Sequence, residues 1–309
     1  MSGPLALLDA AGLYFRAFYA LPDSLVAEDG TQVNAVRGYA DFVARILTER
    51  RPSRLVSCLD ADWRPAFRVE ALPSYKAHRV ADPAANIEEV PDTLTPQVPI
   101  ILDLLDAVGL ATAQADGYEA DDVIGTLAAL ETVDPVEVVS GDRDLFQVVR
   151  TEPTPVSVIY VGRGWAKAEL FGPQELAERY ALPEDSGRAY ADMALLRGNP
   201  SDGLPGVAGV GEKTAAKLIT KYGSLEALLA AAQDPDGGVP LRVRSALSDA
   251  AAYVAAAPRV VRVAIDAAVE FDRDDPVPAK PRDLDRVREL QERWNLGAPV
   301  DRLLAALPG

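Results

Sequence analysis

Short apolar runs alternate with amphipathic stretches along the first half of the chain. The runs of Leu, Val and Ile that predict buried strands are residues 5–8, 55–59, 136–139 and 156–161. The stretches with helical spacing of apolar positions are residues 33–49, 95–108 and 121–130. Regular alternation of strand and helix predicts an α/β fold, with a mostly parallel sheet flanked by helices on both faces.

From about residue 171 the pattern becomes helical, which divides the chain into a region 1–170 and a helical C-terminal region 171–309. The helices predicted there are residues 173–180, 190–196, 213–222, 225–232 and 284–294. Residues 260–271 are expected to return as a strand. Segments rich in Pro, Gly and Asp predict loops at residues 234–238 and 272–281.

Acidic residues follow the predicted strands. Asp9, Asp60 and Asp142 each end or follow one, so a parallel sheet would bring them to the same edge. Further acids are found close by at Glu119, Asp121, Asp122 and Asp144. A single acid such as Glu119 at a helix start is more often a cap. Several converging carboxylates repel one another unless cations lie among them, and oxygen ligands favour Mg²⁺ or Mn²⁺.

The scarcity of other reactive side chains narrows the chemistry. Cys58 is the single cysteine and His78 the single histidine, which excludes an internal disulfide and a thiolate zinc site and disfavours a Ser-His-Asp triad. Of the reactions considered, metal-assisted attack of water on a phosphodiester is the one that these residues still allow. The cysteine content favours a reduced, cytoplasmic setting. The opening apolar run is too short for a signal peptide or membrane span, so no membrane partner is expected.

A glycine turn at residues 206–215 indicates binding of a phosphate backbone. Gly209 and Gly211 precede a helix start, where free N–H groups attract anions, and Lys213, Lys217 and Lys221 recur along one helix face. A dinucleotide fold would need a strand before this turn, whereas residues 197–205 have turn chemistry. The net charge of −16 argues against a polyanion partner. The local basic segments at 64–79 and 213–221 matter more for binding than the net charge of the chain, because salt screens distant charges.

With the acids and the glycine turn in place, the chain resembles the 5′-nuclease family. This family includes flap endonucleases and the N-terminal 5′–3′ exonuclease domain of bacterial DNA polymerase I, which here would stand alone. The segments that carry the resemblance are residues 7–9, 15–20, 60, 67–68, 75–79, 117–126, 140–145 and 206–215. It implies a PIN-like nuclease core, a helical arch at about 63–93 and a helix–three-turn–helix at about 190–232.

The resemblance also implies roles for individual residues. Metal ligands would be Asp9, Asp60, Glu119, Asp121, Asp122, Asp142, Asp144, Asn199 and Asp202. Catalytic contacts to the scissile phosphate would come from Lys76 and Arg79, with Arg16 beside the metals. DNA-binding residues would be Arg68, Tyr75, Gly209, Gly211, Lys213, Thr214 and Lys217. K⁺ could bind the carbonyls of Val207 and Val210. Arg68 could instead be a solvated surface charge, and Tyr75 a packing residue rather than a base-stacking one.

One position departs from the family pattern. The family carries Gly-Asp-x-x-Asp-Asn where this chain reads Gly-Asn-Pro-Ser-Asp-Gly at residues 198–203, so Asn199 replaces the first aspartate. An amide oxygen can ligate a metal but contributes no charge. We therefore expect a weaker second metal site that depends more on Mn²⁺.

The expected function is that of a structure-specific 5′ nuclease in replication and repair. It would hydrolyse DNA at 5′ flaps, nicks, gaps and duplex ends, as a monomer, with a DNA polymerase and a ligase acting in trans. One alternative is a catalytically weak DNA-junction binding protein, which Asn199 favours. A ribonuclease on the same core is a second alternative, against which the duplex-binding turn argues.

Overall fold

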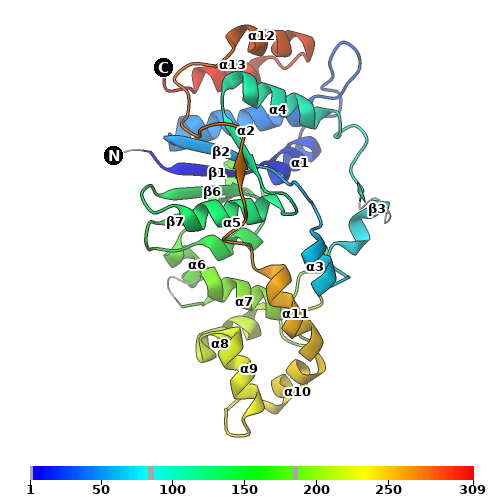
Figure 1. Cartoon of the computed structure of the whole chain (residues 1–309), viewed down its shortest axis with the longest axis vertical. Helices are drawn as coiled ribbons and strands as arrows, with labels where there is room; N and C mark the ends of the chain where they lie inside the picture. Colours follow the sequence, from blue (N-terminus) through cyan, green and yellow to red (C-terminus); the bar gives the residue numbers. More distant parts are fainter. Residues whose placement is uncertain (1–2, 83–86, 184–186) are drawn as a thin grey trace.

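A central sheet of mostly parallel strands organises the chain (Figure 1), in a computed structural model that describes residues 3–82, 87–183 and 187–309. The parallel strands are β1 (Leu5–Asp9), β2 (Arg54–Cys58), β5 (Ala111–Gln114), β6 (Val136–Ser140) and β7 (Val156–Tyr160). Short antiparallel strands close the edges, β8 (Glu169–Phe171) beside β7 and β9 (Glu270–Phe271) beside β5. The strand order is β8-β7-β6-β1-β2-β5-β9, which confirms the predicted α/β fold.

The sheet is buried on both faces. Side chains alternate along a strand, so Leu5 and Leu7 of β1 enter one core while Ala6 and Leu8 enter the other. Helix α5 (Ala120–Leu130) packs on the first face. The helices that contribute to the second core are α1 (Ala10–Ala20), α2 (Asn34–Arg50), α4 (Gln97–Val108), α12 (Leu284–Arg293) and α13 (Ala298–Ala305).

A second group of helices, called the helical end below, forms the end of the molecule opposite to α12 and α13 (Figure 1). These are α6 (Pro173–Tyr180), α7 (Gly187–Arg197), α8 (Glu212–Tyr222), α9 (Leu225–Gln233), α10 (Leu241–Asp249) and α11 (Ala251–Val261). Helices α6 to α9 confirm the periodicity-based predictions, whereas α10 and α11 were not foreseen. The predicted strand at 260–271 is wrong for most of its length. Val260 and Val261 complete the alanine-rich α11, and the strand is confined to β9.

The arch segment, residues 63–93, is described at 63–82 and 87–93, and α3 is the one α-helix in these residues, where a helical arch is predicted. Its described residues form a short helix α3 (Ala66–Ala71), a 3₁₀ turn at Ala77–Arg79, and an antiparallel pair of strands, β3 (Val80–Asp82) and β4 (Ile87–Glu88). Pro65 immediately precedes α3 and Pro73 lies just beyond its end, while Pro91 follows β4. Because proline lacks an N–H donor and restricts the residue before it, Pro65 and Pro73 confine α3 to the short stretch between them.

The final helices return to the sheet layer. Helix α13 packs on α2, and α12 packs on α4, so residues 284–305 lie away from the helical end in Figure 1. The division of the chain at about residue 170 remains a prediction. Over the described residues, no helix is both long and apolar enough to span a membrane.

The helical end depends on a buried ion pair. Asp192 of α7 is fully buried, accepts a hydrogen bond from the Leu225 N–H at 3.0 Å, and pairs with Arg262 at 2.7 Å. We expect Asp192→Ala to lower the free energy of unfolding by about 1–3 kcal/mol, because it leaves the buried Leu225 N–H without its acceptor and removes one of the two carboxylates that pair with Arg262. Urea unfolding followed by circular dichroism would measure this loss. The exposed Asp249, substituted in the same way, is the control, and equal stabilities of the two variants would contradict the prediction.

Candidate active site

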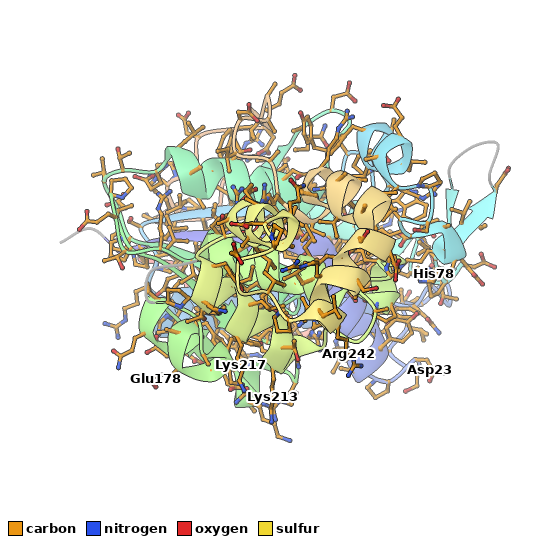
Figure 2. The ribbon with its side chains drawn as sticks, turned by 90° about the horizontal axis from the view of Figure 1, so that it is seen from below. Asp23, His78, Glu178, Lys213, Lys217 and Arg242 are labelled. Atoms are coloured by element: carbon orange, nitrogen blue, oxygen red, sulfur yellow. The ribbon has the colours of Figure 1, made fainter. Side chains whose placement is uncertain are left out.

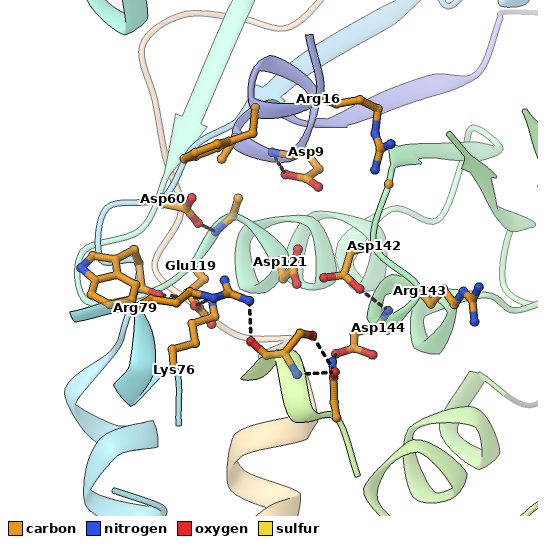
Figure 3. Close-up of a pocket in the computed structure, with 18 of the residues that line it drawn as sticks. Asp9, Arg16, Asp60, Lys76, Arg79, Glu119, Asp121, Asp142, Arg143 and Asp144 are labelled. Carbon is orange, nitrogen blue, oxygen red and sulfur yellow. Dashed lines mark hydrogen bonds and ion pairs between the residues drawn. The ribbon is translucent and has the colours of Figure 1, made fainter. Parts of the chain in front are cut away.

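Acidic side chains from separate elements line one cavity of about 770 Å³ at the carboxyl edge of the sheet (Figure 3). Asp9 ends β1 and caps α1 by accepting a hydrogen bond from the Gly12 N–H at 2.8 Å. Further acids follow β2 and β6 or lie at the start of α5, namely Asp60, Glu119, Asp121, Asp142 and Asp144. Glu88 of β4 and Glu212 of α8 also line the cavity. The structure thus brings together the carboxylates that the sequence placed at this edge.

The electrostatics of the cavity indicate negative charge that protein cations do not fully balance. Burial raises the pKa of Asp121 well above its usual range, and the carboxylates of Asp142 and Asp9 add to this rise. Burial, followed by repulsion from Asp142 and Asp202, raises the pKa of Asp144 to about 7. A cation among these groups would favour their ionised forms.

The donor set of the cavity fits a hard divalent cation. Carboxylate and amide oxygens are the groups available, as Mg²⁺ and Mn²⁺ prefer. As the side chains stand, no three acidic, His or Cys side chains in the described ranges are close enough to hold an ion together. Glu119 and Asp202 are instead paired with cationic side chains of the protein.

Arg68 and Tyr75 correct the DNA-binding predictions. Arg68 is 2 % exposed, and its Nη1 donates to Glu119 at 2.5 Å and to Asp122 at 2.7 Å. Tyr75 is 6 % exposed, and its hydroxyl donates to Glu119 at 2.7 Å. The burial of both side chains argues against direct contact with DNA, and it favours the alternative that Tyr75 is a packing residue. Both residues instead hold Glu119 in place.

Asp122 corrects the predicted metal set. It is fully buried, and its two oxygens accept 2.7 Å hydrogen bonds from Nη1 and Nη2 of Arg68. Its carboxylate also accepts hydrogen bonds from the N–H groups of Glu119 and Ala264. A carboxylate engaged in this way is structural and cannot reach an ion in the cavity.

Lys76 and Arg79 extend from the arch segment to the acidic wall (Figure 3). Lys76 forms an ion pair with Glu119, and Arg79 pairs with Asp202 at 3.0 Å. The backbone fixes this arrangement, since the Lys76 N–H donates to the Asp202 carbonyl at 2.9 Å. Gly203 has φ +73°, and a Cβ there would lie 2.1 Å from the Ser74 carbonyl oxygen, so the close approach requires glycine.

Arg16 lies at the other side of the cavity (Figure 3). Its Nη1 donates to the Gly162 carbonyl at 2.7 Å, and its guanidinium packs against Gly141, where a Cβ would lie 2.3 Å from Nη2. Its buried Nε has no hydrogen-bond partner among the described atoms. The Arg16 side chain itself lines the cavity.

The glycine turn precedes α8 at the helical end. Gly209 has φ +74°, and Gly211 is the residue immediately before the helix. Lys213, Thr214 and Lys217 are exposed on α8, and neither lysine forms an ion pair with a described residue. The Val207 carbonyl accepts a hydrogen bond from the Val210 N–H at 2.9 Å. Binding of K⁺ by these carbonyls remains a prediction.

Two basic residues near this turn differ from expectation. Lys221, which the sequence placed in one row with Lys213, donates to the Gly238 carbonyl at 3.0 Å and to the Tyr222 hydroxyl at 2.9 Å. Arg242, at the start of α10, was missed. Its Nη2 lies 3.0 Å from the position of a Cβ on Gly209, and Figure 2 shows it on the same side as Lys213 and Lys217. Its position at a helix start after a Gly-Gly turn is the signal that could have found it.

Substitution of the buried Arg68 distinguishes a role in stability from a role in DNA binding. We expect Arg68→Ala to lower the free energy of unfolding by about 3–5 kcal/mol, because Glu119 and Asp122 stay buried without their partner. Thermal and urea unfolding would measure this loss against Arg179→Ala, an exposed arginine on α6. A variant as stable as the control but weaker in DNA binding would restore the surface role of Arg68.

The chain matches known proteins over nearly its whole length. A family model described as "5'-3' exonuclease, N-terminal resolvase-like domain" matches residues 4–181, and "5'-3' exonuclease, C-terminal SAM fold" matches residues 186–285. A 5′-3′ exonuclease of Mycobacterium tuberculosis is 56 % identical, over 99 % of this chain and 98 % of the relative. One from Streptomyces coelicolor is 51 % identical, over 97 % and 99 %. DNA polymerase I of Mycobacterium bovis is 40 % identical over 73 % of this chain and 24 % of the polymerase.

Solved structures share the fold. The bacteriophage T5 flap endonuclease, in a complex with DNA and metal ions, aligns with a TM-score of 0.63 and 16 % identity over 99 % of each chain. The catalytic core of Rad2 with DNA substrate aligns with a TM-score of 0.60 and 16 % identity, over 99 % of this chain and 92 % of the other. The extent of the family matches and the identity to complete relatives show that this chain belongs to the 5′-3′ exonuclease family.

Proposed function

We propose that this protein is a divalent-metal-dependent 5′ nuclease that cleaves DNA at junctions of single and double strands, by both 5′–3′ exonuclease and flap endonuclease action. The observation that carries this proposal is the position of the acidic cavity between the cationic side chains of the arch segment and Arg16. Family membership supports it, as do the relatives named 5′-3′ exonuclease. The T5 and Rad2 structures with DNA support DNA as the partner.

The proposed ion ligands are the cavity carboxylates together with the turn after α7. They are Asp9, Asp60, Glu119, Asp121, Asp142, Asp144 and Asp202. Mg²⁺ or Mn²⁺ bound there would supply activation of water and neutralisation of charge on the phosphate oxygens. K⁺ at the glycine turn is a further proposal. A monomer, with a polymerase and a ligase acting in trans, is the proposed working form.

The residues around the cavity would position the scissile phosphate. Lys76 and Arg79 present cations at the wall, where they can bind phosphate oxygens and offset negative charge as it develops. The guanidinium of Arg16 adds a positive charge at the opposite side of the cavity. Further away, Gly209, Gly211 and the exposed cations Lys213, Lys217 and Arg242 would contact the duplex backbone.

A catalytically weak DNA-junction binding protein is the second candidate. Asn199 favours it, because its amide contributes no charge where the acids of the cavity otherwise do. The remaining carboxylates favour the nuclease.

Loss of one carboxylate tests the proposed chemistry. We expect Asp142→Asn to reduce cleavage of a 5′-flap duplex by about 100-fold or more, because an ion loses a ligand, while affinity for the flap is retained. The assay uses DNA labelled at its 3′ end with EDTA, Mg²⁺ or Mn²⁺, and a native gel measures binding. Asp116→Asn, an exposed acid outside the cavity, is the control. Cleavage by the unchanged protein in EDTA, or retained activity of Asp142→Asn, would reject the metal mechanism, and binding without cleavage in either metal would favour the second candidate.

The proposed duplex contact is tested by its salt dependence. We expect the combined change Lys213→Ala, Lys217→Ala and Arg242→Ala to weaken flap binding and to reduce the slope of log K against log salt by about 1 for each lost phosphate contact. Fluorescence anisotropy at several salt concentrations measures both. Lys221→Ala is the matched control, since its ammonium is already bound to Gly238 and Tyr222. An unchanged slope in the triple variant would remove this surface from the DNA interface.

A further inference from the structure

The side chain of Asn199 lies between two acidic residues of the cavity. Its Nδ2 donates to Asp202 Oδ2 at 2.7 Å and to Asp144 Oδ2 at 3.3 Å. Its Oδ1 accepts hydrogen bonds from the Ser201 hydroxyl at 2.6 Å and from the Ser201 N–H at 3.2 Å. Carboxylates only accept and the backbone N–H only donates, so the contacts on both sides require this orientation of the amide.

This orientation removes the oxygen of Asn199 from the carboxylates. The atom that could ligate a cation is held by Ser201, while the NH₂ group occupies the space between Asp144 and Asp202. The backbone fixes the turn, because Asn199 and Leu204 exchange N–H···O bonds of 3.0 and 2.9 Å. The amide therefore links two like charges with hydrogen bonds, without carrying a charge itself.

The second oxygen of Asp202 is also engaged. Arg79 Nη2 donates to Asp202 Oδ1 at 3.0 Å and to the Ser201 carbonyl at 2.7 Å. Both oxygens of Asp202 thus have protein donors. A cation that binds between Asp144 and Asp202 must therefore displace at least the Asn199 amide, which donates to both carboxylates.

We propose that Asn199 competes with the divalent cation at the Asp144–Asp202 pair instead of ligating it, so that the DNA-free protein binds a cation there weakly. The inference rests on the proposed function, in which these acids are ion ligands. Asn199 is then a positioning residue that holds the pair together while no cation is bound. If substrate phosphate draws Arg79 from Asp202, it frees an acceptor for the cation, and by linkage the cation and the DNA strengthen each other's binding.

The sign of the effect of two substitutions tests this proposal. Mn²⁺ alone is titrated into the DNA-free full chain, and free Mn²⁺ is followed by electron paramagnetic resonance. We expect Asn199→Ala to tighten Mn²⁺ binding at one site by a few fold, because the competing donor is removed. We expect Asn199→Asp to tighten it by about tenfold, because a charged ligand is added. Asn295→Asp, which makes the same change of charge far from the cavity, should leave the affinity unchanged.

Two outcomes would overturn the inference. Weaker Mn²⁺ binding by Asn199→Ala would show that the amide oxygen is a ligand, and unchanged binding in both Asn199 variants would show that the pair holds no cation. Melting temperatures measured without metal identify a variant whose turn fails to fold, and Asn199→Asp preserves the acceptor for Ser201. If no form of the protein cleaves flap DNA but Asn199→Ala still tightens Mn²⁺ binding, the nuclease proposal fails and the role of Asn199 is supported.

Discussion

The buried guanidinium of Arg68 is the contact on which the rest of the site depends. It pairs with Glu119 and Asp122 at the start of α5, and its Nε donates to the Val260 carbonyl of α11 at 3.0 Å. One side chain thus joins the arch segment, the sheet layer and the helical end. Taking three charged groups out of water is costly, and only their mutual hydrogen bonds offset that cost. The cavity wall is consequently rigid where Glu119 stands.

The same contact explains how neighbouring acids acquire different roles. Successive residues of a helix point about 100° apart, so Asp121 and Asp122 cannot face the same partner. Asp122 turns to Arg68 and is fully buried, whereas Asp121 lines the cavity. Glu119, one turn earlier, lies between the two environments and receives both Arg68 and Lys76. A run of acids in a sequence therefore divides into structural and chemical members.

Much of the fold was predictable because its signals are local. Buried strands read as apolar runs, and acids placed at the ends of parallel strands necessarily meet at one edge. Helix α11 was missed because alanine blurs its apolar stripe, and α10 because it buries Leu247 alone and so shows no stripe. Pro65 and Pro73, on either side of α3, were given less weight than the family resemblance. The burial of Arg68 and Tyr75 depends on Glu119 and on α11, both far away in sequence. Periodicity contains no information about such partners, so the sequence could not place Arg68 in the interior and left packing of Tyr75 as an alternative.

The closing strand of the sheet has a consequence for how the protein is made. The edge of β5 is covered by β9, and α2 is covered by α13, although both coverings come from the last part of the chain. During synthesis the earlier segments emerge first, so the β5 edge and the part of α2 that packs on α13 stay uncovered until residues 270–305 have left the ribosome. Contacts of such long sequence separation form late and slow folding. The nascent chain therefore passes through a stage in which its sheet is open to pairing with other chains, a stage at which chaperones would have their substrate.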